Sequence, residues 1–154
     1  MAAGKSREFA ESILQYFAGD ANALPSHTGL YVALLSAIPA GTQPYDGSAI
    51  SGKEILAGTY RAPLGTNKLS TIEKDTTNNA MSITNDGASP EIEFPTVAPE
   101  AFDVSGYAIT LNATSVEASA YLAYETFTTA AKRKQVDAGD TIKINSEGLV
   151  IKEK

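Results

Sequence analysis

The sequence predicts a mainly β protein, an antiparallel β-sandwich with one N-terminal α-helix. From residue 30 onward, short stretches of apolar, β-branched and aromatic residues alternate with Gly, Asn, Asp and Ser turn residues, as they do in sandwich domains. A stretch near the N-terminus has instead the periodicity of an amphipathic helix. With 154 residues and 43% hydrophobic content, the chain can bury one core. We therefore expect a single domain over residues 1–154, with the helix and a turn in residues 1–28 and the sandwich in residues 29–154.

The helix is predicted from Ser6 to Ala18. Its apolar residues fall on one face at helical spacing, namely Phe9, Ala10, Ile13, Leu14 and Phe17. Ser6 is a suitable N-cap and Gly19 a suitable stop. This face can pack against the chain's own sheet or dock into a neighbouring subunit. We expect it to pack against the sheet, which would make Leu14 a buried core residue.

Residues 30–37 are apolar at nearly every position, which predicts a strand covered on both faces. Residues 39–58 are rich in Gly and Pro and contain few apolar residues. They predict a long surface loop, and loops of this length often make functional contacts. Because surface loops contribute little to a core, we expect the sandwich to fold without residues 43–51.

Short strands account for the rest of the chain. Met81 and Ile83 alternate with polar residues, and Asn85-Asp86-Gly87 is typical of a turn. Further strands are predicted at residues 92–94, 104–111, 120–128, 141–145 and 149–152. We expect the last two to pair as a hairpin across residues 145–148. Strict alternation places Tyr121 and Tyr124 on opposite faces of their strand.

Composition excludes several classes of function. The net charge of −6 argues against nucleic-acid binding, because Lys and Arg supply most of the affinity for phosphates. The absence of cysteine excludes disulfides, thiolate metal sites and cysteine nucleophiles. The sequence contains neither a signal-peptide core nor a run of the ~20 apolar residues that span a bilayer, so we expect no membrane insertion.

The sequence carries no residue pattern that indicates an enzyme. Gly4-Lys5-Ser6 lacks the upstream glycine and the preceding strand of a phosphate-binding loop. The only histidine, His27, falls in a predicted turn. Glu91 and Glu93 share one face of a strand, about 7 Å apart, and a glycosidase carboxylate pair is the alternative to two solvated glutamates. We predict solvated glutamates, no catalytic residue, no metal site and no cofactor.

Partner contacts are expected from the 39–58 region, from a tyrosine beside it and from one basic run. Apolar residues in a surface loop have little reason to be there unless a partner covers them. Tyrosines inside the predicted strands are expected in the core, whereas those in or beside the loop can contact a partner. The basic run is either a solvated turn or a partner-facing patch. The predicted contact residues are Tyr45, Ile50, Ile55, Leu56, Tyr60, Lys132, Arg133 and Lys134.

Four blocks of sequence occur in a characteristic order. They are Gly29–Pro39, which contains Leu-Tyr-Val-Ala-Leu, then Glu91-Ile-Glu-Phe-Pro95, Gly106-Tyr-Ala-Ile-Thr-Leu111 and Val136–Ile144, which begins Val-Asp-Ala-Gly-Asp-Thr. In this order they resemble a family of small virion proteins of tailed bacteriophages, usually described as tail-fibre or minor tail proteins. The family commonly has a Trp-Gly pair after the Phe-Pro block, where this chain has Phe102-Asp103.

The resemblance implies a non-enzymatic structural protein of a tailed phage virion, made in the host cytoplasm. Such a protein would be an accessory on the particle exterior, as a capsid decoration or a tail-associated component. Its partners would be capsid or tail subunits and further copies of itself, with no nucleic acid. A receptor-binding or glycan-binding tail-fibre module is the alternative.

Overall fold

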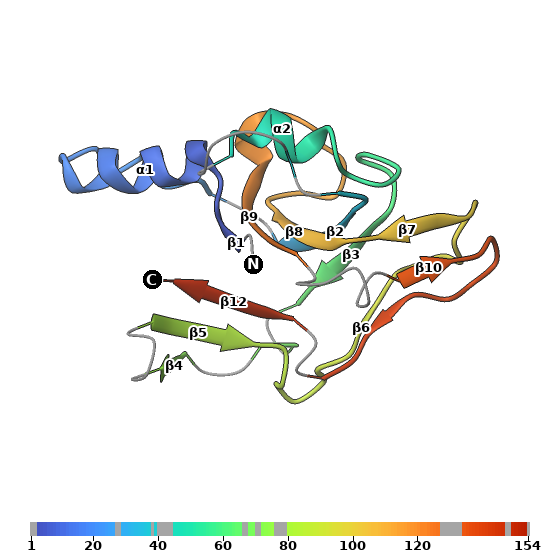
Figure 1. The fold of residues 1–154 in the computed structure, drawn as a ribbon. Helices are drawn as coiled ribbons and strands as arrows, with labels where there is room; N and C mark the ends of the chain where they lie inside the picture. Colours follow the sequence, from blue (N-terminus) through green and yellow to red (C-terminus); the bar gives the residue numbers. More distant parts are fainter. Residues whose placement is uncertain are drawn as a thin grey trace.

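A five-stranded antiparallel sheet lies at the centre of the molecule (Figure 1). Its strands lie in the order β1 (Ala3–Lys5), β9 (Tyr121–Thr126), β8 (Gly106–Thr110), β2 (Leu30–Leu35) and β3 (Arg61–Leu64). The computed structural model describes residues 3–26, 29–37, 39, 45–65, 68–69, 72–75, 80–126, 134–146 and 149–153.

Three smaller antiparallel sheets accompany it. They are β12 (Val150–Glu153), β5 (Ala80–Thr84) and β4 (Glu73–Asp75); β10 (Lys134–Val136) with β7 (Phe102–Val104); and β11 (Lys143–Ile144) with β6 (Ile92–Glu93). The helices are α1 (Arg7–Phe17), the short α2 (Gly47–Ser51) and the 3-10 turn η2 (Ala118–Ala120). The protein is mainly β with antiparallel sheets and one main helix, which confirms the predicted fold class.

The central sheet is covered on both faces, as the apolar sequence of β2 predicts. Val32 and Leu34 face a core shared with β6, β7 and β10. Ala33 and Leu35, which alternate with them, face a second core shared with α2 and η2. Residues Val32–Leu35 are all buried. The sheet therefore has short β-ribbons on one face and short helices on the other.

Strand β9 departs from simple alternation. Tyr121 and Tyr124 are both buried in the core beneath α2, although three positions separate them. The register explains this, because Ile109 pairs with Ala123 while Thr110 pairs with Tyr121. One extra residue in β9 shifts the faces, as in a β-bulge. The prediction from strict alternation is therefore wrong for this pair.

Helix α1 is fixed to the sheet only at its start. Ser6 is buried and caps the helix by accepting a 3.2 Å hydrogen bond from the N–H of Phe9. Its own N–H donates to the carbonyl of Leu122 at 2.8 Å. Beyond the first turn α1 extends away from the sheet (Figure 1), and none of its residues is buried. The expectation that its apolar face packs on the chain's own sheet is wrong, since Leu14 is 70% exposed.

The region predicted as a surface loop, residues 39–58, contains part of the core. Asp46 caps α2 by accepting a 2.7 Å hydrogen bond from the N–H of Ala49, and Ile50 is fully buried. Helix α2 passes so close to η2 that a Cβ added at Gly47 would lie 1.9 Å from the carbonyl oxygen of Ala118. Because α2 covers the sheet, residues 43–51 cannot be removed without exposing this core, contrary to the prediction.

The C-terminal strands do not form the predicted hairpin. Strand β11 pairs with β6, and β12 pairs with β5. The fully buried Asn85 helps to hold this arrangement. Its side-chain oxygen accepts from the N–H of Leu149 at 2.8 Å, while its amide nitrogen donates to the carbonyls of Pro90 at 3.0 Å and Asn145 at 2.8 Å. Asn145 and Leu149 are distant from Asn85 in sequence, so a local turn pattern could not reveal these two contacts.

The edges of the central sheet are short or interrupted. Strand β1 has 3 residues, and β3, on the other edge, has 4 and contains the exposed Pro63. Among the described residues no helix is long and apolar enough to cross a membrane.

Candidate functional site

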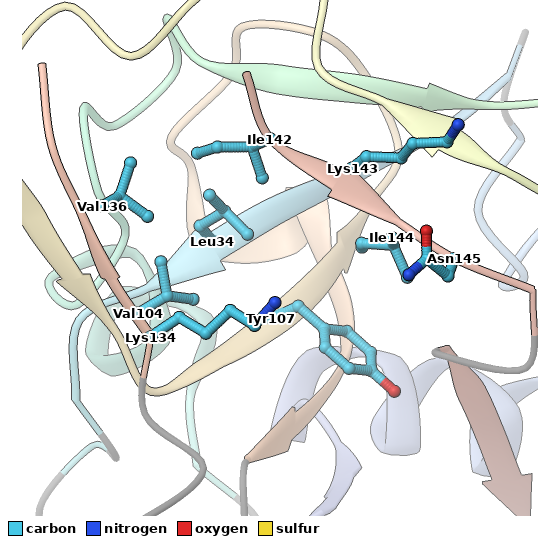
Figure 2. Close-up of a pocket in the computed structure, with 9 residues that line it drawn as sticks. All are labelled: Leu34, Val104, Tyr107, Lys134, Val136, Ile142, Lys143, Ile144 and Asn145. Carbon is cyan, nitrogen blue, oxygen red and sulfur yellow. The ribbon is translucent and has the colours of Figure 1, made fainter. Parts of the chain in front are cut away.

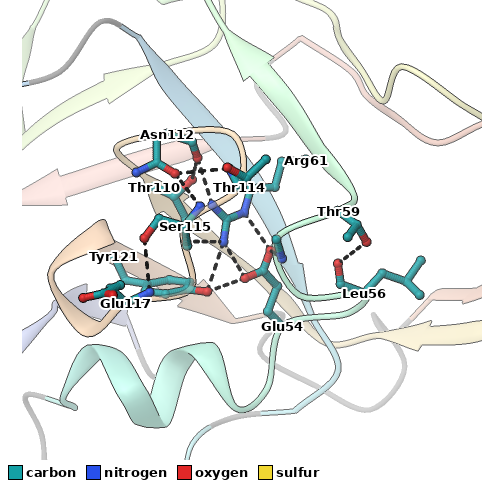
Figure 3. A network of polar contacts seen from close by, with 11 residues as sticks. Glu54, Leu56, Thr59, Arg61, Thr110, Asn112, Thr114, Ser115, Glu117 and Tyr121 are labelled. Carbon is teal, nitrogen blue, oxygen red and sulfur yellow. Dashed lines mark hydrogen bonds and ion pairs between the residues drawn. The ribbon is translucent and has the colours of Figure 1, made fainter.

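A buried polar network joins three segments of the chain (Figure 3). Arg61, on β3, forms a two-pronged ion pair with Glu54, through Nε to Oε1 at 2.7 Å and Nη2 to Oε2 at 2.8 Å. Tyr121 donates its hydroxyl hydrogen to Glu54 and accepts from Arg61 Nη2 at 3.1 Å. Arg61 also donates to the carbonyls of Asn112 at 2.8 Å and Ser115 at 2.9 Å.

The electrostatics of this network follow from its burial. The side chains of Arg61 and Glu54 are 1% and 0% exposed. Burial, with the hydrogen bond to Glu54, raises the pKa of Tyr121 to about 12. Burial alone would lower the pKa of Arg61, but hydrogen bonding to and the charge of Glu54 outweigh it, so that pKa is raised. The arrangement keeps a charged pair and a neutral tyrosine enclosed, which fastens β3, β9 and the 112–115 turn together.

Half of the predicted contact residues lie in the core. Tyr45, Ile50, Ile55 and Tyr60 are buried, because residues 45–58 wrap back onto the sheet. Tyr60 stacks on Phe94 with ring centroids 5.1 Å apart and donates to the carbonyl of Thr96 at 2.7 Å. These side chains therefore stabilise the fold and are not available to a partner.

The remaining predicted contact residues differ among themselves. Leu56 is partly buried against the main core and has a positive φ of 51°. Lys134 is exposed on β10. Lys132 and Arg133 lie outside the described residues, as does His27. Of the predicted contact residues that the structure describes, only Lys134 is both exposed and beside a pocket.

That pocket opens between β7, β10 and β11 (Figure 2) and has a volume of about 230 Å³. Its wall is mostly apolar, and two lysines and an asparagine stand among the lining residues. The residues that line it are Leu34, Val104, Tyr107, Lys134, Val136, Ile142, Lys143, Ile144 and Asn145. We call it the β10–β11 pocket. No local sequence pattern indicates this pocket, because its residues come from four separate stretches of the chain.

The second surface feature is the α1 apolar face, which we define as Leu14 and Phe17 with the adjoining Tyr16. Leu14 is 70% exposed, Phe17 80% and Tyr16 47%. The rings of Tyr16 and Phe17 meet edge to face with centroids 6.3 Å apart. Large apolar side chains grouped on an exposed helix are typical of an interaction surface. The sequence did reveal the apolar stripe of this helix, but not that the stripe lies in solvent.

Glu91 and Glu93, the alternative glycosidase pair, share one lysine as their ion-pair partner. Lys143 Nζ lies 2.5 Å from Glu91 Oε2 and 3.5 Å from Glu93 Oε1. The hydrogen bond to Glu91 raises the pKa of Lys143. Both glutamates are more than half exposed, as expected of solvated residues. Within the described residues no group of His, Asp and Glu side chains could hold a metal ion.

No protein-family model matches the sequence, and no curated protein is significantly similar to it. The resemblance to small tail proteins of bacteriophages therefore stays a prediction from the order of the four sequence blocks.

Proposed function

We propose that the protein is a non-enzymatic structural component of a tailed-phage virion, an accessory on the particle exterior that acts through subunit contacts. The order of the four sequence blocks supports the virion class. The observation that carries the mode of action is the α1 apolar face, which is held out from the sheet and exposes Leu14 and Phe17. In a free subunit these apolar side chains remain in contact with water, which is unfavourable, whereas in an assembly a partner can bury them.

The energy available from this face is enough to decide incorporation. Full burial of one Leu or Phe side chain contributes roughly 1.5 to 3 kcal/mol, and each ~1.4 kcal/mol changes an equilibrium tenfold. Helix α1 can present these side chains firmly because its first turn is fixed at two points. The N–H of Arg7 donates to the carbonyl of Tyr45 at 2.9 Å, and Glu8 Oε2 accepts from the N–H of Gly47 at 2.8 Å.

The test is incorporation into particles. Virions carrying the wild-type gene should contain the protein, and the variant Leu14→Ser/Phe17→Ser should be reduced at least about tenfold in copies per particle by quantitative mass spectrometry. Ile72→Ser is the matched control, because Ile72 is 67% exposed and lies outside α1. Hundreds of copies of the wild type would indicate a decoration protein, and a handful a tail component.

Absence of the wild-type protein from purified virions would contradict the virion assignment. Equal incorporation of the wild type and the double variant would show that α1 is not the assembly surface. The receptor-binding or glycan-binding alternative makes a different prediction, which is specific retention of host glycans by the purified subunit.

A further inference from the structure

The α1 apolar face and the β10–β11 pocket are complementary in kind but cannot meet within one molecule. Helix α1 projects from one end of the central sheet, beside β1, while β7 and β10 lie at the opposite end (Figure 1). The helix is also held at its base by Ser6 and Glu8, as described above. Contact between the two surfaces therefore requires two copies of the chain.

The size and lining of the pocket suit one or two large apolar side chains. At about 230 Å³ it is smaller than the ~300 to 1,000 Å³ of pockets that hold drug-sized ligands. Ile142, Val136 and Leu34 form part of its apolar wall (Figure 2). Aromatic and aliphatic anchors that fill such pockets supply most of the energy of many protein interfaces. Phe17, at 80% exposure, is the most exposed of the large apolar side chains in the described residues.

The charges around the two surfaces are also complementary. The charged residues that line the pocket are lysines, Lys134 and Lys143. Helix α1 carries Glu8 and Glu11, its one basic residue, Arg7, lies at its base beside Asp46, and its last turn has no basic residue. Asp20 follows shortly after its end, and the terminal carbonyls of a helix add partial negative charge. Lys143 is already paired with Glu91 and Glu93, so Lys134 supplies most of the attraction.

We propose that α1 of one copy inserts Phe17 and Leu14 into the β10–β11 pocket of a second copy. The inference rests on the proposed function in so far as both require assembly through subunit contacts, and it names the partner as the chain itself. The contact uses a different surface on each copy, so the association runs head to tail. Head-to-tail contacts close into rings or continue as filaments, according to the rotation between copies.

Cysteine pairing tests the contact directly, because the chain contains no cysteine of its own. One copy carries Ala18→Cys, at the exposed end of α1, and the other Asn145→Cys, at the pocket. Mild oxidation of the mixture should give disulfide-linked heterodimers. Ile72→Cys in place of Asn145→Cys is the control and should give at least tenfold less product. Equal yields with both partners would overturn the proposal.

Mixing of interface variants distinguishes head-to-tail pairing from helix-to-helix pairing. In sedimentation velocity the wild type should self-associate with increasing concentration, and Phe17→Ser and Lys134→Glu alone should each do so at least tenfold more weakly. Their mixture should form dimers, because each retains one intact surface. Lys74→Glu, the same charge change at an exposed residue of β4, should behave as wild type. Circular dichroism of each variant establishes that it is folded.

Two outcomes would overturn the inference. In one, Phe17→Ser dissociates while Lys134→Glu associates as the wild type does. In the other, the wild type stays monomeric and gives no cross-link. If that monomeric protein still enters virions through α1, the proposed function stands and only the self-docking inference fails.

Discussion

At the scale of single residues, the Glu54–Arg61–Tyr121 network shows how a charged pair is accommodated in this core. Removing charges from water is costly unless geometry and additional hydrogen bonds compensate. Here the guanidinium of Arg61 reaches both oxygens of Glu54, two backbone carbonyls and a tyrosine hydroxyl. The guanidinium also lies 5.5 Å from the centroid of the Tyr121 ring, within cation–π range.

Removing one charge of this pair should be severely destabilising. Glu54→Gln leaves Arg61 buried without its counter-charge, so we expect a loss of about 3 to 5 kcal/mol in the free energy of unfolding. Glu93→Gln removes one exposed partner of Lys143 and should cost less than about 1 kcal/mol. Urea denaturation measures both. A loss at Glu54 as small as that at Glu93 would show that the network is dispensable.

Tyr121 should make the protein sensitive to alkali. Its pKa is raised from 10.0 to about 12 in the folded state, so the folded state disfavours its ionisation. The associated stability is present below about pH 10 and is lost as pH rises toward 12, with a total of about 2 to 3 kcal/mol. Burial also raises the pKa of Tyr60 and Tyr124, and they add to the same trend.

The pH dependence of unfolding checks this prediction. Tyr121→Phe should be less stable than the wild type at pH 8, because it loses two hydrogen bonds, and its stability should fall less steeply between pH 10 and 12. Parallel curves for the two proteins would contradict the assignment of the alkaline loss to Tyr121.

At the scale of elements, the burial of the two helices is the opposite of what their sequences suggest. Helix α1 has a well-defined apolar stripe, of which no residue is fully buried and Leu14 and Phe17 are exposed, whereas α2 has 5 residues and buries Ile50 completely. Periodicity shows which face of a helix is apolar but not what covers that face. Helix α2 covers the sheet because the hydrogen bonds around Asp46 and the close approach at Gly47 place it against η2.

Truncation of each helix should therefore give opposite results for stability. Ile50→Ala should cost about 2 to 5 kcal/mol, as truncation of buried large aliphatic residues does. Leu14→Ala should change the free energy of unfolding by less than about 0.5 kcal/mol, as surface substitutions do. Thermal and urea unfolding of the isolated variants provide the comparison. A large loss at Leu14 would mean that α1 packs on the domain after all.

The sequence alone was sufficient to predict the elements that have a strong local pattern. The doubly covered strand β2 and the cap at Ser6 were predictable because apolar runs and capping residues act locally. Pairing of β11 with β6 depends on contacts about 50 residues apart, which alternation cannot specify. The β10–β11 pocket is assembled in the same way, so only Lys134 of its lining residues was predicted as a contact residue.

At the scale of the whole molecule, the protein has three layers, and a few contacts between distant segments hold its parts together. The helices cover one face of the central sheet, the β-ribbons cover the other, and the β12–β5–β4 sheet is tied in through Asn85 and Leu149. Asn85 is fully buried and uses both atoms of its amide. It thus connects the end of β5 with Asn145, just after β11, and with Leu149, just before β12.

Replacement of Asn85 should loosen the β12–β5–β4 sheet. Asn85→Ala removes three hydrogen bonds and leaves their backbone partners buried, so we expect a loss of about 2 to 4 kcal/mol. Asn22→Ala, at an exposed position, is the matched control and should be close to neutral. Amide hydrogen exchange should show faster exchange in β5 and β12 before the central sheet is affected. Uniform acceleration across all strands would indicate instead that the whole molecule unfolds as one unit.

The edges of the central sheet restrict how copies of this protein can join. A strand added to β3 would meet Pro63, which has no N–H to donate, and a strand added beside β1 would find only 3 residues to pair with. Such edges are a known protection against uncontrolled polymerisation of β-proteins. These edges therefore disfavour amyloid-like stacking of the chain at high local concentration. An ordered contact between copies would then depend on side chains, whose affinity and geometry can be adjusted one residue at a time.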